Sequence, residues 1–321
     1  MKRIAFAAAV AAFCLSAFAQ TFPTRPVKIV VPLPPGPLDG TMRLVSPAMA
    51  EDLGQPVLVE NRPGAAGVIG LEAVARAAPD GYTILGAAGG NFIVAPVVVE
   101  NHPTNPLRDF SPVTVLYDAP AALVVKRSLP VNTLAEFLDY AKKNPGKLSY
   151  GSSGTGGAAH IEGENFKRIT GTNLLHVPYK GYGPMVQAIL GEEIDALVSV
   201  SLSFVQPLAN AGKLKILGIH NRRAADLPNL PYLEDVLPGF FSAPVFVGFL
   251  APAATPRPIV MRLNAAAVKA IRNPEVRGKF ESQGYTLLGN SPEEMGAMMK
   301  QAYERTAQMV KGVRTAGVKL E

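Results

Sequence analysis

The sequence is poor in the residues that usually mark a disulfide-stapled, zinc-binding or nucleic-acid-binding protein. Among 321 residues there are one cysteine, four histidines and no tryptophan. The single cysteine, Cys14, cannot form an internal disulfide, and the scattered histidines lack the spacing of a structural zinc site. The net charge of +6 is dispersed, because no run of Lys and Arg exceeds two residues, so nucleic acid is a poor candidate partner.

Long apolar runs are also missing, since no stretch approaches the roughly 20 apolar residues that a membrane-spanning helix needs. The N-terminus instead has a basic start, an apolar run over 4–12 and the small-x-small motif Ala-Phe-Ala at 17–19, which is typical of a secretory signal peptide. We expect cleavage after Ala19 and export to the periplasm. The bulky residue before Cys14 argues against a lipid anchor.

The remaining chain has enough apolar residues, 48% of the total, to build packed cores, and its length suggests two domains. Strands and helices are predicted to alternate along it. Strands separated by helices of this length favour α/β domains with mostly parallel sheets and helices on both faces. The predicted strands are 27–32, 57–60, 82–85, 148–150, 174–178, 194–200, 215–219 and 285–288; the predicted helices are 40–53, 67–78, 133–143, 157–170, 184–191, 203–211, 258–272, 274–282 and 291–313.

Two loops have the composition of anion-binding loops. The first, 32–39, follows a predicted strand, holds four prolines and a glycine, and ends at Asp39, a suitable N-cap for the helix beginning at Gly40. Exposed amides at a helix N-terminus attract anions, and ligands favour this end of the strands in open α/β sheets. A rigid turn without a ligand is the alternative.

The second loop, 151–160, follows the strand at 148–150 and opens a helix. Its glycines leave backbone amides uncovered beside three hydroxyl groups, which favours a carboxylate or phosphate. Its pattern Gly154-x-Gly156-x-x-Ala159 also resembles a dinucleotide fingerprint. The next strand then should end in an acid, but it ends in Pro178, so an exported NAD(P)-dependent oxidoreductase remains only an alternative.

Catalytic motifs are weak. The segment around Ser153 lacks the last glycine of a nucleophile elbow, and the methionines at 295, 298 and 299 have the spacing of a packed helix face. We expect no enzyme activity, no cofactor and no metal.

Several motifs together resemble the receptors of tripartite tricarboxylate transporters, also called Bug-type solute-binding proteins. The resemblance covers the whole chain after the signal peptide. Its blocks are residues 31–39, 53–57, 59–67, 76–83, 145–150, 152–154, 176–181, 211–214, 250–253 and 262–264.

This resemblance implies a two-lobed, Venus-flytrap periplasmic-binding-protein fold, with lobe 1 at 20–120 plus 245–321 and lobe 2 at 121–244. It implies a monomeric extracytoplasmic receptor that captures a di- or tricarboxylate, an amino acid or an aromatic acid. The receptor would deliver this ligand to the membrane permease subunits of a tripartite tricarboxylate transporter. A ligand sensor that docks on a signalling partner such as a sensor kinase is the second alternative.

The family's ligand-binding positions carry over to both loops and to the wall between them. In the first loop they are Pro34, Gly36 and Asp39. In the second they are Ser152, Ser153, Gly154, Thr155, Gly156 and His160. On the wall they are Asn91, Tyr179, Asp195 and Ser199, with Asp195 expected to accept an ammonium or hydroxyl group.

Three departures from the family pattern bear on the ligand. Pro37 follows Gly36 where a second glycine is usual, Ser199 and its neighbours replace an acidic or amide pair, and Ala95 replaces an asparagine. They suggest a less charged, longer or aromatic distal end of the ligand.

Overall fold

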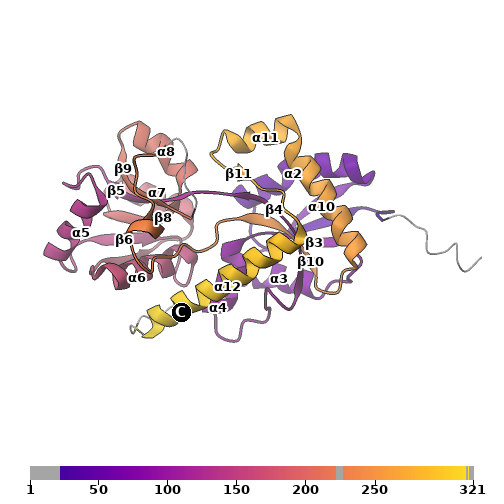
Figure 1. The fold of residues 1–321 in the computed structure, drawn as a ribbon, viewed down its shortest axis with the longest axis horizontal. Coiled ribbons are helices and arrows are strands. Elements are labelled where there is room, and N and C mark those ends of the chain that lie inside the picture. Colours follow the sequence, from indigo (N-terminus) through magenta and orange to yellow (C-terminus); the bar gives the residue numbers. More distant parts are fainter. Residues whose placement is uncertain (1–21, 222–226, 316, 318–321) are drawn as a thin grey trace, which may run out of the picture.

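The chain folds into two α/β lobes that lie side by side (Figure 1). The computed structural model describes residues 22–221, 227–315 and 317. The predicted signal peptide, its cleavage site and Cys14 lie outside these residues. We call the part built on the six-stranded sheet lobe 1 and the part built on the five-stranded sheet lobe 2. No helix of the described residues is long and apolar enough to cross a membrane.

Lobe 1 contains a six-stranded sheet in the order β11-β4-β10-β3-β1-β2. Its strands are β1 (Val27–Val31), β2 (Val57–Asn61), β3 (Thr83–Ala88), β4 (Phe110–Asp118), β10 (Val247–Pro252) and β11 (Thr286–Leu287). Its helices and helical turns are α2 (Pro37–Leu53), η1 (Ala65–Gly67), α3 (Val68–Ala75), η2 (Gly90–Val94), α4 (Ala95–Val98), α10 (Arg257–Arg272), α11 (Pro274–Glu281) and α12 (Pro292–Thr315).

Lobe 2 contains a five-stranded sheet in the order β7-β6-β8-β5-β9. Its strands are β5 (Ala121–Lys126), β6 (Ser149–Ser152), β7 (Leu175–Pro178), β8 (Ala196–Ser201) and β9 (Leu214–His220). Its helices are α5 (Leu134–Lys143), α6 (Ala158–Thr170), α7 (Tyr182–Leu190), α8 (Leu202–Asn210) and α9 (Leu233–Val236).

Both sheets are mixed, which corrects part of the expectation of mostly parallel sheets. In lobe 1, β10 pairs antiparallel with β3 and β4; in lobe 2, β5 pairs antiparallel with β8 and β9. β11 also pairs antiparallel with β4, whereas β10 and β5 are the reversed strands beside the crossings between the lobes. β4 ends at the junction and the chain continues directly into β5, so β5 enters lobe 2 from the edge where β6 and β8 end. A strand entering from that edge must run against them.

Local signals account for several helix ends. Thr133 caps α5, because its hydroxyl accepts a hydrogen bond from the Glu136 amide at 3.1 Å, as a capping box predicts. The start of α2 differs from the prediction: it begins at Pro37 with Gly36 as N-cap, not with Asp39. Proline is favoured at the first helical position because its missing N–H would have no intrahelical acceptor there.

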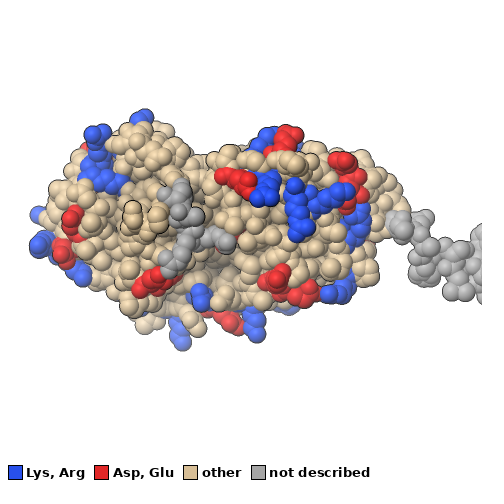
Figure 2. All heavy atoms as spheres, turned by 45° about the horizontal axis from the view of Figure 1, so that its top comes forward, with Lys and Arg blue, Asp and Glu red and all other residues tan. Residues whose placement is uncertain are grey.

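Apolar clusters on the two faces of each sheet form the cores. A further cluster joins the lobes: α12 extends from lobe 1 along both lobes (Figure 1), and its C-terminal half packs against α6 of lobe 2. Met309, Val310 and Val313 of α12 are buried there with Ile161 of α6. On the face drawn in Figure 2, positive and negative side chains are interspersed, with no extended surface of one sign.

Candidate functional site

The loops that the sequence singles out lie at the edges of the two sheets that face each other. β4 leaves lobe 1 at Asp118, and β1 and β3 run in the same direction as β4, since β3 and β4 are both antiparallel to β10. In lobe 2, β5 begins opposite Ser201, the last residue of β8, and β6 runs parallel to β8. The loops after β1 and β6 therefore both lie on the side of the other lobe.

The first loop presents unpaired backbone amides at the start of α2. Residues 34–37 are exposed, and the first helical hydrogen bond runs from the Gly40 amide to the Gly36 carbonyl at 2.8 Å. The amides of Leu38 and Asp39 precede it and have no intrahelical acceptor. Pro37 takes the place of an amide, so the loop offers fewer donors than a Gly-Gly sequence would.

Asp39 braces this loop. The residue is 7% exposed, and both carboxylate oxygens accept from the Arg43 Nε, at 3.1 and 3.0 Å. Arg43 also donates to Asn61 at the end of β2, and the Asn61 amide donates to the Leu33 carbonyl at 3.0 Å. This series of hydrogen bonds, from Asn61 through Arg43 to Asp39, holds the loop in place. The sequence analysis did not predict this role for Asn61.

Asn91 lies close to the same loop. A Cβ atom built on Gly67 would lie 3.5 Å from the Pro32 carbonyl and 4.0 Å from the Asn91 Nδ2. Gly67 is also the N-cap of α3. The structure therefore brings the Asn91 amide and the start of a second helix beside the first loop, and only Asn91 was predicted.

Several polar groups of the second loop form hydrogen bonds within the protein and so stabilise the loop itself. Ser152 is fully buried; its hydroxyl donates to the Gly154 carbonyl at 3.1 Å and lies 2.7 Å from the His176 Nε2. The Gly156 amide donates to the His160 Nδ1 at 3.0 Å, and His160 is 3% exposed. Polar groups of Ser152, Gly156 and His160 are therefore engaged within the protein, with His160 behind the loop; their contact with the ligand stays a prediction.

The histidine pair below the loop is held neutral. The rings of His160 and His176 stack with centroids 3.9 Å apart. Burial lowers the pKa of both, and burial together with the neighbouring His160 lowers the pKa of His176 to about 4. A neutral His160 that accepts from Gly156 at Nδ1 carries its proton on Nε2.

The remaining groups of the second loop are available. Thr155 is exposed and Ser153 half-buried, and their hydroxyls make no hydrogen bond to the described residues. The first helical bond of α6 runs from the Ile161 amide to the Gly157 carbonyl at 3.1 Å, which leaves the amides before Ile161 without intrahelical acceptors. Gly154 has a φ of +143°, so its backbone follows a path that a side chain would strain.

Tyr179 lies beside this loop, but Asp195 does not. The Tyr179 amide donates to the Ser152 carbonyl at 2.9 Å, and its carbonyl lies 3.8 Å from a Cβ built on Gly154. Asp195 precedes β8, at the end of the strand opposite Ser201, where it pairs with Lys126 at 2.8 Å and accepts from the Ser149 amide at 2.8 Å. This placement corrects the prediction that Asp195 contacts the ligand.

Ser199 lies near Glu162, a residue that the sequence analysis did not predict to be part of the site. It lies close enough to Glu162, in the second turn of α6, to lower the pKa of that carboxyl. Glu162 is 1% exposed and also accepts from the Ala243 amide, on the segment that returns to lobe 1. Desolvation, aided by nearby Glu234, raises the pKa of Glu162 to about 8. No local motif marks this position, because only the returning segment buries it.

Residues 41–314 match the family described as the tripartite tricarboxylate transporter family receptor, TctC. The chain belongs to this family. Its relatives include the protein BugT of Bordetella pertussis, 32% identical over 94% of this chain and 93% of that protein. This receptor is also similar in structure to the periplasmic binding protein BugD, with a TM-score of 0.76, 33% identity, and coverage of 93% of this chain and 99% of that one.

Two solved structures similar to this TctC-family receptor contain carboxylates. Rpa4515 of R. palustris, solved with adipate, has a TM-score of 0.78 and 30% identity, and the similarity covers 91% of this chain and 98% of that one. MatC of Rhodopseudomonas palustris, solved with malate, has a TM-score of 0.77 and 30% identity, covering 90% of this chain and 100% of that one. The comparisons support the Bug-type assignment, the two-lobed fold and a carboxylate-binding receptor family.

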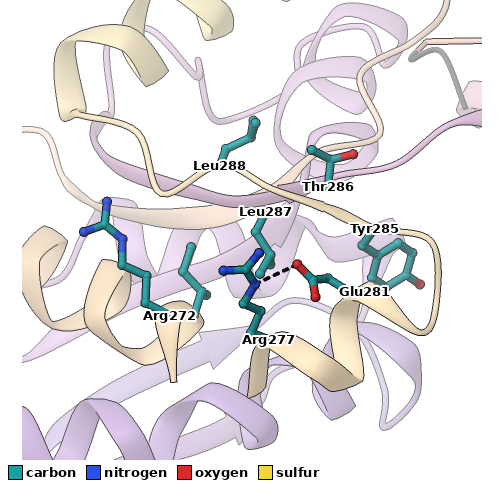
Figure 3. A pocket seen from close by; sticks show the side chains of 8 residues that line it. Arg272, Arg277, Glu281, Tyr285, Thr286, Leu287 and Leu288 are labelled. Carbon is teal, nitrogen blue, oxygen red and sulfur yellow. Dashed lines mark hydrogen bonds and ion pairs between the residues drawn. The ribbon is translucent and has the colours of Figure 1, made fainter. Parts of the chain in front are cut away.

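The receptor also has a pocket of about 490 Å³ on lobe 1 (Figure 3). It is lined by α10, α11 and the segment 285–288, and Arg277 pairs with Glu281 inside it at 2.7 Å. Its one carboxylate, Glu281, is thus already paired with a cation of the same helix, and neither the loop after β1 nor the loop after β6 contributes to its lining. We therefore place the candidate ligand site at the loops. No group of three or more His, Cys, Asp or Glu suited to a metal occurs in the described part of the chain.

Proposed function

We propose that this protein is a periplasmic receptor that captures an organic carboxylate between the two loops and delivers it to a membrane permease. One observation carries the proposal: two helix N-termini with unpaired amides, α2 in lobe 1 and α6 in lobe 2, lie at the facing edges of the two sheets. Each such terminus favours a negative charge through its amides and its dipole. Solved relatives that contain adipate and malate support a carboxylate as the ligand.

The hydrogen-bond donors of the two loops can supply the binding free energy that a receptor needs. A hydrogen bond to a charged group contributes about 1.5–3 kcal/mol net. Four hydrogen bonds donated to a single carboxylate therefore contribute about 6–12 kcal/mol before the costs of ordering the loops and the ligand. Micromolar affinity requires about 8 kcal/mol. Two short rows of amides with the Ser153 and Thr155 hydroxyls can therefore hold a carboxylate without a metal or a buried cation.

We further propose that binding closes the lobes. The units that close are lobe 1 at 20–120 plus 245–321 and lobe 2 at 121–244. The chain crosses from one sheet to the other between Asp118 and Ala121, and it crosses back between His220 and Val247. A ligand held by loops from both lobes favours the closed form, which a membrane permease can distinguish from the open one. Nothing in this mechanism requires bond making or breaking in the ligand.

Calorimetric titration tests the proposal. The mature protein, unfolded and refolded to remove any co-purified ligand, is titrated with malate, adipate, citrate and benzoate, and with NAD and NADP. We expect saturable binding of at least one carboxylate with one site per chain and a Kd of about 100 µM or lower. Binding of NAD or NADP together with no carboxylate would overturn the receptor assignment.

A further inference from the structure

The carboxylate of Glu162 has a free oxygen in a place where free polar atoms are rare. One oxygen of this side chain accepts from the Ala243 amide, while Oε2 has no hydrogen-bond partner among the described residues. Glu162 is 1% exposed. Buried polar atoms are nearly always hydrogen-bonded, and leaving one unpaired costs about 1–3 kcal/mol, more for a charged group. An unpaired buried carboxylate oxygen therefore points to a missing donor.

The position of Glu162 connects it to the loops. It lies four residues after Ala158, the first residue of α6, which corresponds to about 6 Å along the helix axis. Its contact Ser199 is near the carboxyl end of β8, on the same sheet edge as the second loop.

The hydrogen bond from Ala243 places this carboxylate at the junction of the lobes. Glu162 belongs to α6 of lobe 2, whereas Ala243 belongs to the segment that returns to lobe 1.

The charge around Glu162 is unbalanced. Glu234 is near enough to raise its pKa, and Glu234 also has an unpaired buried oxygen, Oε2. No Lys or Arg of the described residues forms an ion pair with either carboxylate. A protonated nitrogen on the ligand would supply the missing hydrogen bond and a positive charge that favours the ionised form of Glu162, whereas a second carboxylate would supply neither.

We propose that Glu162 determines specificity by accepting a hydrogen bond from a protonated nitrogen of the ligand. The ligand then carries an amino group in addition to the carboxylate held by the loops. This inference rests on the proposed function, because it assigns the second half of the same site. It also revises the expectation of an apolar distal wall, which considered Ser199 without Glu162 beside it.

The test compares ligands of one chain length by calorimetry at pH 7: pentanoate, glutarate, 2-aminopentanoate and 5-aminopentanoate. We expect the wild-type protein to bind one of the amino compounds at least tenfold more tightly than pentanoate and glutarate. Glu162→Gln keeps the size and the acceptor for Ala243, and it should reduce that preference to less than threefold. Asp195→Asn is the matched control. It removes the carboxylate that precedes β8, at the end of that strand away from the second loop, and it should leave the preference unchanged.

The outcomes separate the two proposals. Equal or tighter binding of pentanoate or glutarate, or a preference that survives in a folded Glu162→Gln variant, overturns the role of Glu162 and leaves the carboxylate receptor standing. Failure of all four compounds, and of malate, adipate, citrate and benzoate, overturns both. Melting curves establish that each variant is folded. Ser199→Ala removes the hydroxyl that lowers the pKa of Glu162 and should therefore reduce the amino preference; an unchanged preference in both variants overturns the role of Glu162.

Discussion

The backbone amide of Ala243 donates a hydrogen bond to the carboxylate of Glu162, which ties α6 of lobe 2 to the segment returning to lobe 1. Because this carboxylate is buried, its pKa rises from an ordinary value of 4.5 to about 8. The folded protein thus binds a proton more tightly than the unfolded chain does. The contribution to stability is fully present below pH 4.5 and is lost as the pH rises to about 8.

We therefore predict that Glu162→Gln makes the ligand-free protein more stable than the wild type at pH 8.5, by at least 1 kcal/mol in the free energy of unfolding. The neutral amide avoids the cost of a buried charge. Urea unfolding at pH 5 and pH 8.5 measures this, and the difference between the proteins should be small at pH 5. A variant less stable than the wild type at both values would contradict the assigned burial.

His220 gives the opposite pH dependence. It is fully buried, its Nε2 lies 3.1 Å from the Val198 carbonyl, and burial lowers its pKa from 6.5 to about 4. The unfolded chain takes up a proton before the folded protein does, so this contribution to stability is present above pH 6.5 and is lost as the pH falls to about 4.

For one fully buried histidine with this difference in pKa, the loss is about 3 kcal/mol. His220→Gln removes the titration while it keeps a polar side chain. We predict a shallower decrease in the free energy of unfolding between pH 6.5 and pH 4.5 than in the wild type, measured by urea unfolding. His176 still titrates in the variant, so part of the slope remains. An unchanged slope would show that His220 is not the group responsible.

The hydroxyls of the second loop should matter for affinity and not for folding. Ser153 and Thr155 make no hydrogen bonds to the described residues through their side chains. The double variant Ser153→Ala with Thr155→Val should weaken the tightest carboxylate at least tenfold, while the melting temperature of the ligand-free protein changes by less than about 2 °C. Unchanged affinity would remove these two groups from the site.

Gly163 of α6 leaves room for the ring of Tyr150. A Cβ built on Gly163 would lie well inside van der Waals contact with three ring atoms, and the Tyr150 hydroxyl is fixed by Glu164 at 2.7 Å. Gly163→Ala should therefore destabilise the protein by about 1–3 kcal/mol through overpacking.

Gly183 of α7 is the matched control, because a Cβ built there meets no atom within 4 Å. Gly183→Ala should leave the free energy of unfolding unchanged or raise it by up to about 1 kcal/mol, since alanine favours helix. Similar effects of both substitutions would contradict the described packing of α6 on Tyr150.

Local patterns predicted much of the fold. The strand after residue 26, the capping box at Thr133 and the packed face with Met295 and Met299 all agree with the structure. The strands β4, β5 and β10 were not identified, because each is a buried, nearly continuous apolar run without a period. These are also the strands at the crossings, so missing them concealed the antiparallel pairings.

The site was harder to predict than the fold because composition does not show which polar groups are already paired. Ser152 and Gly156 have the residue types of a binding loop, yet their donors are used by the loop itself and by His160. Asp195 was judged by its proximity to a strand without knowing which end of that strand faces the other lobe. Glu162 depends on Ala243, a contact between residues distant in sequence.

The most direct test of the two-loop site is the response of its amides to a carboxylate. We predict that malate or adipate, added to uniformly ¹⁵N,²H-labelled protein, shifts the amide resonances of Leu38 and Asp39 in lobe 1 and of Ala158 and Ala159 in lobe 2, all with one Kd. Shifts confined to one lobe, or no shift at any of the four amides while the ligand binds elsewhere, would contradict capture between the loops.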